Sequence, residues 1–175
     1  MKRNEIERRA ADLRTSCGVI APPVPVEQIA IYKGIQVVRS AAEWSESGFL
    51  LRDNERIIIG VNSRNSPRRQ RFTIAHELGH WCLHEGKPLI VDQSVMINKR
   101  DDVSSQATDS QEIDANYFAA ELLMPKQFVA DAVRRHMRTS GGSREEFVTA
   151  LARDFDVSTE AMGWRLINLG VLSSG

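Results

Sequence analysis

The chain has 175 residues, of which 42% are hydrophobic and 26% charged, and its 23 basic and 23 acidic side chains leave no formal net charge. This length suits one compact domain, and the balanced charge gives no overall attraction to nucleic acid or to an anionic membrane. No apolar run approaches the about 20 residues of a membrane span, and the first residues, MKRNEIERRAADLR, lack the apolar core of a signal peptide. We therefore expect a cytoplasmic protein whose Cys17 and Cys82 are reduced and buried.

The N-terminal part of the chain predicts two helices followed by a small sheet. Apolar residues at helical spacing predict a helix over residues 2–17 that Gly18 ends, and after APPVPV a short helix runs over about 26–33. Three runs rich in β-branched residues then predict strands: IQVVR, SGFLLR and RIIIGV. Asp53 and Asn54 mark a turn between the last two runs, so the sheet should contain a hairpin.

The rest of the chain predicts helices separated by polar segments. Ser66 is expected to cap a helix that begins at Pro67 and extends to Gly86. The polar stretch from Lys87 to Ser110 predicts a surface loop. Helical spacing then predicts an amphipathic helix in QEIDANYFAAELLMP that Pro125 ends, and a further helix over about 126–137. Capping residues predict two tail helices. The first starts at a capping box of Ser143 and Glu146, and the second starts near Ser158.

Residues 71–86, RFTIAHELGHWCLHEG, hold three of the four histidines. His76 and His80 are four residues apart, so a helix presents both imidazoles on one side, about 6 Å apart along its axis, where both can bind one cation. Glu77 lies beside them and is expected to reach a water at that cation rather than the cation itself. The pattern H-E-x-x-H is typical of the zinc-peptidase helix, which carries two ligands and a general base. The stretch therefore predicts a zinc site rather than a helix with surface histidines.

A catalytic zinc needs a third protein ligand and an open position for water. His84 lies a further turn beyond His80, so the three imidazoles form a line and do not converge on one cation. A histidine at a helix end that interacts with the terminal carbonyls is the simpler interpretation of His84. Cys82 lies well around the helix from the metal side and is better interpreted as a core residue. The third ligand is therefore expected from another element.

The helix predicted further along the chain offers that ligand. Glu112 and Asn116 are four residues apart and share a face, whereas apolar residues occupy the packing side. A carboxylate at position 112 can bind the cation, and the Asn116 carbonyl oxygen can accept the free ring N–H of a ligand histidine and fix its tautomer. Two alternatives stay open on spacing alone. Asp109 and Glu112 can form a capping box, and Asp114 is a rival ligand.

The segment FTIAHELGHWCLH, followed further along by EIDANYFAAELLMP, resembles the two motifs of the ImmA/IrrE family of bacterial and phage-associated metallopeptidases. In that family the second motif reads E-x-x-A-N-x-F-A followed by L-L-M-P. The upstream PPVPVEQIAIYKGIQV and the tail VSTEAMGWRLINLG extend the resemblance over most of the chain. The resemblance implies that His76, His80 and Glu112 bind the metal and that Glu77 is the general base. It also implies a protein substrate, a helix-turn-helix transcriptional repressor, whose cleavage switches on a mobile element or a stress response.

Together these observations predict an α+β fold, a minimal zincin-like domain of the gluzincin type, in which a small twisted sheet packs on the H-E-x-x-H helix and a helical second half supplies Glu112. Residues 1–138 are expected to form the peptidase domain, and residues 139–175 a helical subdomain packed on it. The expected cofactor is Zn²⁺, with Mn²⁺ or another divalent metal as the alternative, and a substrate strand is expected along an exposed sheet edge. Tyr117 and His136 are candidates for the donor that stabilises the oxyanion.

Two other roles are alternatives to the peptidase. The tail ALARDFDVSTEAMGWRLINLG is similar to a helix-turn-helix, but its second helix offers only Arg165 as a cation for DNA, so we expect packing or substrate docking there and no nucleic-acid partner. A binding module that sequesters a repressor without hydrolysis is the second alternative. The complete H-E-x-x-H argues against it, because a structural zinc takes four closed ligands and has no use for Glu77.

Overall fold

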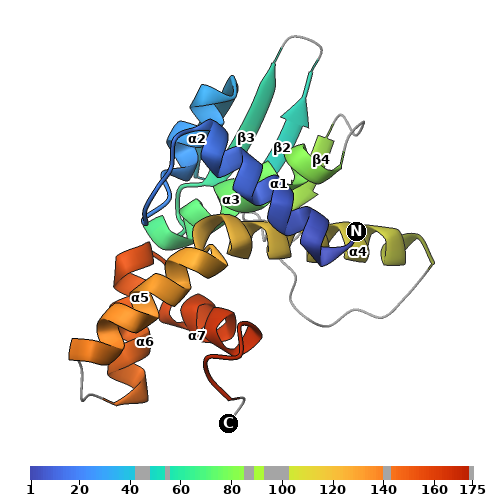
Figure 1. Cartoon of the computed structure of the whole chain (residues 1–175). Coiled ribbons are helices and arrows are strands. Elements are labelled where there is room, and N and C mark those ends of the chain that lie inside the picture. The colour runs from blue at the N-terminus through green and yellow to red at the C-terminus, as the bar shows by residue number, and fades with distance from the viewer. Residues whose placement is uncertain (42–47, 54–55, 85–88, 93–102, 140–142, 174–175) are drawn as a thin grey trace.

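The computed structural model describes residues 1–41, 48–53, 56–84, 89–92, 103–139 and 143–173. These residues contain seven helices: α1 (Arg3–Ser16), α2 (Val26–Tyr32), α3 (Pro67–Leu83), α4 (Val103–Leu123), α5 (Lys126–Thr139), α6 (Arg144–Phe155) and α7 (Thr159–Asn168). They also contain four strands: β1 (Ile35–Ser40), β2 (Gly48–Arg52), β3 (Ile57–Asn62) and β4 (Leu89–Asp92). The sheet lies at one end of the molecule and α5 to α7 at the other, with α3 and α4 between them (Figure 1). The α+β prediction is confirmed, and no described helix is long and apolar enough to cross a bilayer.

The sheet has the strand order β1-β3-β2-β4. Strand β1 pairs with β3 in parallel, and β2 pairs antiparallel with both β3 and β4. The predicted hairpin joins β2 to β3, since the Asp53 N–H donates to the Arg56 carbonyl at 2.8 Å and the Arg56 N–H donates back at 3.1 Å. Asn54, the other expected turn residue, lies outside the described residues. The two outer strands, β1 and β4, form the edges of the sheet.

The loop predicted from Lys87 to Ser110 is wrong in two places. Residues 89–92 form β4, and α4 begins at Val103, so Ser110 lies well inside a helix. A four-residue strand carries little pattern of its own, and β4 exists because it pairs with β2, a contact between segments far apart in the chain. The first turns of α4 have the sequence VSSQATDS, whose Ser, Thr and Asp residues are weak helix formers. These residues are helical because they extend a helix that packs against α3 and α1.

Serine caps mark three helix starts where the sequence predicts them. The hydroxyl of Ser66 accepts the backbone N–H of Arg69 at 3.3 Å at the start of α3, and Ser158 accepts that of Ala161 at 3.1 Å at the start of α7. At α6 the predicted capping box is complete, because Ser143 accepts from the Glu146 N–H and the Glu146 carboxylate accepts from the Ser143 N–H. These local hydrogen bonds satisfy N–H groups that have no partner inside the helix.

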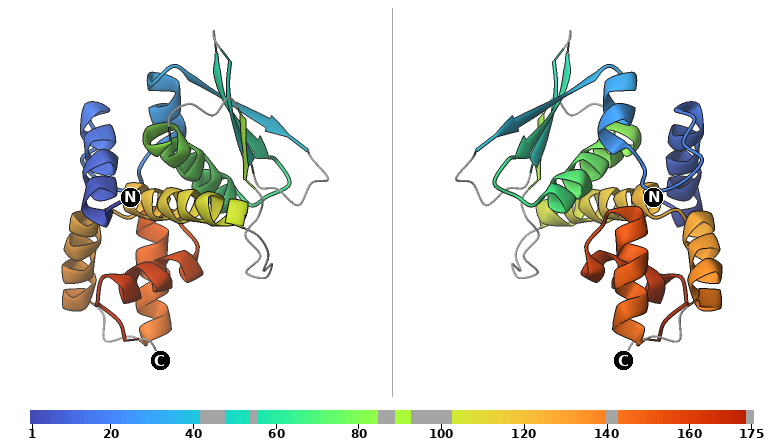
Figure 2. Two further views of the ribbon diagram at one scale, coloured as in Figure 1. Left: turned by 90° about the vertical axis from the view of Figure 1, so that its right-hand side faces the viewer. Right: turned by 90° about the vertical axis from the view of Figure 1, so that its left-hand side faces the viewer.

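Helix α3 is the central helix of the fold. Every residue from 73 to 80 is buried, because β2 and β3 pack on one side of α3, α4 on another and α2 on a third. Figure 2 shows α3 between the sheet and α4. The helix ends at Leu83, earlier than the predicted end at Gly86, which lies outside the described residues. Arginines from two other elements bind its last carbonyls: Arg52 of β2 donates to His80 O at 2.8 Å, and Arg9 of α1 to Cys82 O at 2.7 Å.

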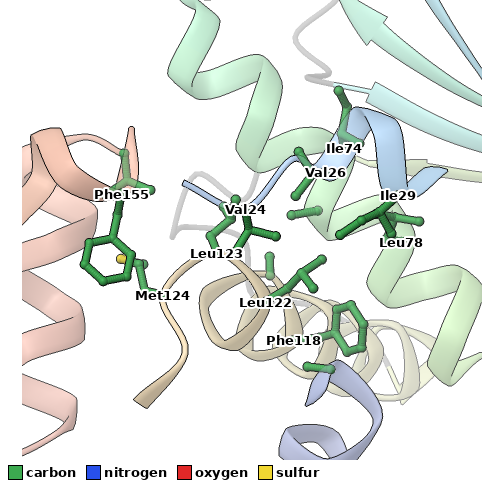
Figure 3. Close-up of a cluster of buried hydrophobic side chains, with 14 of the residues drawn as sticks. Val24, Val26, Ile29, Ile74, Leu78, Phe118, Leu122, Leu123, Met124 and Phe155 are labelled. Carbon is green, nitrogen blue, oxygen red and sulfur yellow. The ribbon is translucent and has the colours of Figure 1, made fainter. Parts of the chain in front are cut away.

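One cluster of buried apolar side chains extends from the sheet to the C-terminal helices. Figure 3 shows its middle part, where side chains from the segment before α2, from α2, from α3 and from the end of α4 meet: Val24, Val26, Ile29, Ile74, Leu78, Phe118 and Leu122. Met124, just after α4, lies beside Phe155 of α6 (Figure 3). The cluster therefore includes residues on both sides of position 138, and the division into two domains at that position stays a prediction.

Ion pairs also connect the C-terminal helices to α3 and α4. Arg165 of α7 is buried, pairs with the buried Glu121 of α4 and donates from Nε to the Met124 carbonyl at 2.9 Å. Asp156, at the end of α6, has a φ of 50° and pairs with Arg71 of α3 at 3.1 Å. Arg165, the one cation that the second tail helix offers for DNA on sequence grounds, is thus turned into the protein and neutralised there.

Candidate metal centre

Helices α3 and α4 bring His76, His80 and Glu112 together. The Nε2 atoms of His76 and His80 are 3.0 Å apart, and the Glu112 carboxylate oxygens lie 3.1 Å from His76 Nε2 and 3.2 Å from His80 Nε2. One potential ligand atom from each residue lies within 4.8 Å of the other two. Around a tetrahedral cation with bonds of 2.0–2.1 Å, neighbouring ligand atoms are roughly 3.3 Å apart. Two imidazoles and one carboxylate at these separations therefore fit a divalent cation.

The Glu112 side chain has the charge that a ligand needs. Burial by itself raises the pKa of this carboxyl group, but the hydrogen bonds from His76 and His80 outweigh burial and lower the pKa to about 2. The carboxyl group is therefore ionised at neutral pH, as metal binding requires. The side chains of His76 and His80 are buried, and that of Glu112 is 13% exposed.

The close crossing of α3 and α4 depends on Gly79. A Cβ atom at position 79 would stand 3.1 Å from both the Cα and the carbonyl oxygen of Ala115 and 3.3 Å from the Cβ of Phe118. Glycine inside a helix costs about 1 kcal/mol relative to alanine, so the sequence predicts a close neighbour at this position. That prediction is confirmed: the backbone of α4 lies against Gly79, one turn from His76 and next to His80.

The two histidines differ in what holds their second ring nitrogen. His76 Nδ1 lies 3.1 Å from the Asn116 carbonyl oxygen, which can only accept a hydrogen bond. This contact assigns the ring proton to Nδ1 and leaves the lone pair of Nε2 toward the cluster. His80 Nδ1 is buried and has no hydrogen-bond partner in the described part of the chain. Asn116 thus orients one of the two imidazoles.

Glu77 is fully buried and lies on the sheet side of α3, beside the first residue of β2. A Cβ atom on Gly48 would stand 3.5 Å from Glu77 Oε1. His76 and Glu77 are neighbours in sequence, so their side chains leave α3 on different sides. The role of Glu77 as the general base of the H-E-x-x-H pattern stays a prediction.

The other candidate ligands lie outside the cluster of His76, His80 and Glu112. His84 is buried, and its Nε2 lies 3.1 Å from the carbonyl oxygen of Gln111 on α4, not from a terminal carbonyl of its own helix as the sequence predicts. Cys82 is a free, half-buried thiol, and burial raises its pKa to about 12. Asp114 pairs with the amino group of Met1 at 2.8 Å. Asp109 lies inside α4 rather than at its start, so the capping-box alternative is wrong.

The two candidate oxyanion donors are engaged elsewhere. The Tyr117 hydroxyl donates to Glu7 of α1 at 2.6 Å, and burial raises the pKa of Tyr117 to about 12. His136 of α5 lies 2.9 Å from Asp154 of α6. Neither contact connects to the cluster. Thr73 was not predicted as a site residue and lies on α3 one turn before Glu77, and the spacing of four residues is its sequence signal.

Comparison with known proteins agrees with this geometry. Residues 30–166 match the family model of a peptidase family, described as the IrrE N-terminal-like domain. The radiation response metalloprotease IrrE of Deinococcus deserti is 34% identical over 107 residues, which are 61% of this chain and 34% of that protein. The protein of the same name from Deinococcus radiodurans is 32% identical over 93 residues, or 53% of this chain and 26% of that protein. This chain thus spans about a third or less of the length of these two relatives.

Two further relatives come from a phage and from a solved structure. The uncharacterized immunity region protein 2 of Bacillus phage phi105 is 29% identical over 105 residues, 59% of this chain and 60% of that protein. A solved structure titled Mycobacterium tuberculosis transcriptional regulator superposes with a TM-score of 0.64 at 18% identity, over 94% of this chain and 46% of that one, which shows a shared fold. Since the family model matches most of the sequence, including every residue of the cluster, the chain belongs to the IrrE N-terminal-like domain family of peptidases.

Proposed function

We propose that this chain is a zinc-dependent endopeptidase of the cytoplasm that cleaves a helix-turn-helix transcriptional repressor. The observation that carries the proposal is the cluster formed by the two imidazoles of the H-E-x-x-H helix and the Glu112 carboxylate of α4, with Glu77 buried on the same helix as the imidazoles. A structural zinc has four closed protein ligands, whereas three ligands leave a position open for chemistry. The donor set also suits Mn²⁺ or another divalent metal, with zinc favoured by the two imidazoles.

In this proposal His76, His80 and Glu112 hold the cation, and Asn116 keeps His76 in the required tautomer. The cation, when bound, supplies a Lewis acid that makes water more acidic and polarises the substrate carbonyl. Glu77 accepts a proton from water as the water oxygen forms a bond to the carbonyl carbon. Glu77 then gives that proton to the peptide nitrogen as the carbon–nitrogen bond breaks. The products are a carboxylic acid and an amine, which become a carboxylate and an ammonium group when the acid proton passes to the amine, and Glu77 returns to its ionised starting state.

The substrate segment is proposed to lie as an extended strand along β4. Strand β4 forms one edge of the sheet, and its neighbour β2 carries Gly48, which lies against Glu77. An edge strand offers backbone N–H and C=O groups that can pair with a further strand. A peptide paired there would be extended, so that a single peptide carbonyl group could reach the cluster.

The choice of a repressor as substrate rests on resemblance. The motifs are similar to those of the ImmA/IrrE family, and the Deinococcus relatives are named radiation response metalloproteases, which fits a role in a stress response. The phage relative is named for an immunity region, which fits control of a mobile element. A role in direct DNA binding is disfavoured, because Arg165 is buried in an ion pair with Glu121.

The test is cleavage of a purified helix-turn-helix repressor, chosen first from the genes that neighbour this chain's gene, followed on a gel with parent, Glu77→Gln and Glu145→Gln proteins. Glu77→Gln should keep the metal and bind the repressor but cleave it roughly 10²–10⁴-fold more slowly. Glu145→Gln is the matched control, because Glu145 is exposed on α6, and it should cleave at the parental rate. If parent and Glu77→Gln both bind the repressor and neither cleaves it with any divalent metal, the chain sequesters the repressor instead. Cleavage by Glu77→Gln at the parental rate removes Glu77 from the mechanism.

A further inference from the structure

Helix α3 carries a buried polar residue that the mechanism above does not use. Thr73 is 1% exposed, and its hydroxyl has no hydrogen-bond partner in the described part of the structure. A threonine inside a helix commonly satisfies its hydroxyl on the carbonyl four residues earlier. A buried hydroxyl without a partner is destabilising, so such a group in a native fold calls for an explanation. Thr73 lies four residues before Glu77, on the same face of α3.

Strand β2 lies close to both Thr73 and Glu77 at Gly48. A Cβ atom on Gly48 would stand 2.3 Å from Thr73 Cγ2, 3.5 Å from Glu77 Oε1 and 2.7 Å from the carbonyl oxygen of Gly60. Any side chain at position 48 would therefore displace one of these groups. Glycine allows the backbone of β2 to come this close. The methyl group of Thr73 is the part that meets β2, so β2 restricts rotation of the Thr73 side chain.

We propose that Thr73 is a positioning residue for Glu77. The two side chains make no hydrogen bond to each other in this structure. In the substrate complex the Thr73 hydroxyl donates to the Glu77 carboxylate and holds it in the orientation that accepts and returns the proton. Cβ atoms four residues apart on a helix are about 5–6 Å apart, a separation that a threonine hydroxyl and a glutamate carboxylate can bridge. An ionised carboxylate only accepts hydrogen bonds, and the hydroxyl supplies a donor. The inference rests on the proposed role of Glu77 as general base.

A purely structural role for Thr73 makes a different prediction. If the side chain only fills the space beneath Gly48, valine has nearly the same shape and should serve equally well. Serine keeps the hydroxyl but loses the methyl group that packs against β2. Removal of a buried, unpartnered hydroxyl should not destabilise the fold, whereas loss of a buried methyl group should. The two substitutions therefore separate the hydroxyl from the packing.

The experiment measures kcat and KM for the cleaved repressor, metal content and melting temperature for the parent, Thr73→Val and Thr73→Ser. Thr73→Val should keep its metal, its KM and its melting temperature and lose about 10- to 100-fold in kcat, the size of effect that a misoriented catalytic group produces. Thr73→Ser should keep a kcat near that of the parent and melt at a lower temperature. In a Glu77→Gln background, Thr73→Val should not lower the residual rate further, because there is no base left to position.

Two results would overturn the inference. Thr73→Val with the parental kcat shows that the hydroxyl is not needed, and leaves the role of Glu77 intact because the Glu77→Gln comparison tests that role separately. A parallel loss of kcat and melting temperature in both variants shows that Thr73 is structural. If Thr73→Val does not fold, Thr73→Ala against Thr73→Ser makes the same comparison of hydroxyl and packing. If the parent protein does not cleave the repressor, the proposed function is wrong, and the positioning role of Thr73 is then wrong as well.

Discussion

Gly79 shows how a single residue sets the geometry of the cluster. It lets the backbone of α4 approach α3 at Ala115, between Glu112 and Asn116 in sequence, and so brings Glu112 to the two histidines. Gly79→Leu should force the helices apart and destabilise the protein by about 1–3 kcal/mol or more. It should also reduce metal content, because Glu112 moves away from His76 and His80. Urea unfolding and elemental analysis of the purified variant measure both effects.

Gly163 provides the matched control for this substitution. It also lies inside a helix, α7, but a Cβ atom there would meet nothing within 4 Å. Gly163→Ala should therefore stabilise the protein by up to about 1 kcal/mol through helix propensity alone. If Gly79→Leu is as stable as the parent and retains its metal, the close crossing at Gly79 does not position Glu112.

Residues within one helix were more predictable from the sequence than residues that meet across elements. The period of a helix is enough to put His76 and His80 on one side, and their Nε2 atoms are 3.0 Å apart. Glu112 could be nominated from its face of a helix, but spacing could not separate it from Asp114, because the choice depends on how α4 docks on α3. Thr73 could not be foreseen for the same reason, since its setting exists only once Gly48 of β2 lies over it.

At the scale of elements, the connection between α7 and α4 rests on a buried ion pair. Arg165 and Glu121 are 3% and 6% exposed, so removing one of them leaves a buried charge without its partner. Arg165→Met should destabilise the protein by about 3–5 kcal/mol, and Arg165→Met combined with Glu121→Leu should be less destabilised than the sum of the two single variants. Chemical denaturation of the four proteins gives the coupling between the two side chains.

An exposed ion pair serves as the control for this cycle. Arg8 and Asp12 on α1 pair at 3.1 Å, with side chains 61% and 65% exposed, so Arg8→Met should change stability by no more than about 1 kcal/mol. Strict additivity of the Arg165 and Glu121 substitutions would show that the pair does not connect α7 to α4. The same outcome would reopen the question of whether Arg165 can turn outward to another partner.

Elements with strong local signals were predicted, and elements that depend on distant partners were not. The serine caps at positions 66, 143 and 158 and the runs of β-branched residues gave the starts of three helices and three strands. Strand β4 was missed because four residues become a strand only through pairing with β2. The first turns of α4 were missed because their polar residues favour caps and turns over helix interiors. The end of α3 was misjudged because no glycine marks it. The helix ends at Leu83, where arginines from α1 and β2 donate hydrogen bonds to its final carbonyls.

At the scale of the whole molecule, the fold brings together two helices whose site residues are separated by β4 and by the first turns of α4. Helix α3 is fixed by the sheet on one side and by Asp156 after α6 at its start, and α4 is fixed by α1 and by Arg165 of α7. A cation bound to His76, His80 and Glu112 would join these two helices directly. The proposed metal centre is therefore also a link between the N-terminal and C-terminal halves of the chain.

The most direct test of this account is the metal content of single alanine variants, measured by elemental analysis of folded, purified protein. The parent should carry a stoichiometric divalent metal, zinc above all, and His76→Ala, His80→Ala and Glu112→Ala should each lose it. His84→Ala and Cys82→Ala should keep it, because His84 contacts Gln111 and Cys82 lies away from the cluster. Full metal occupancy in Glu112→Ala, or loss of the metal in a folded His84→Ala, would contradict a centre built from α3 and α4 in this way.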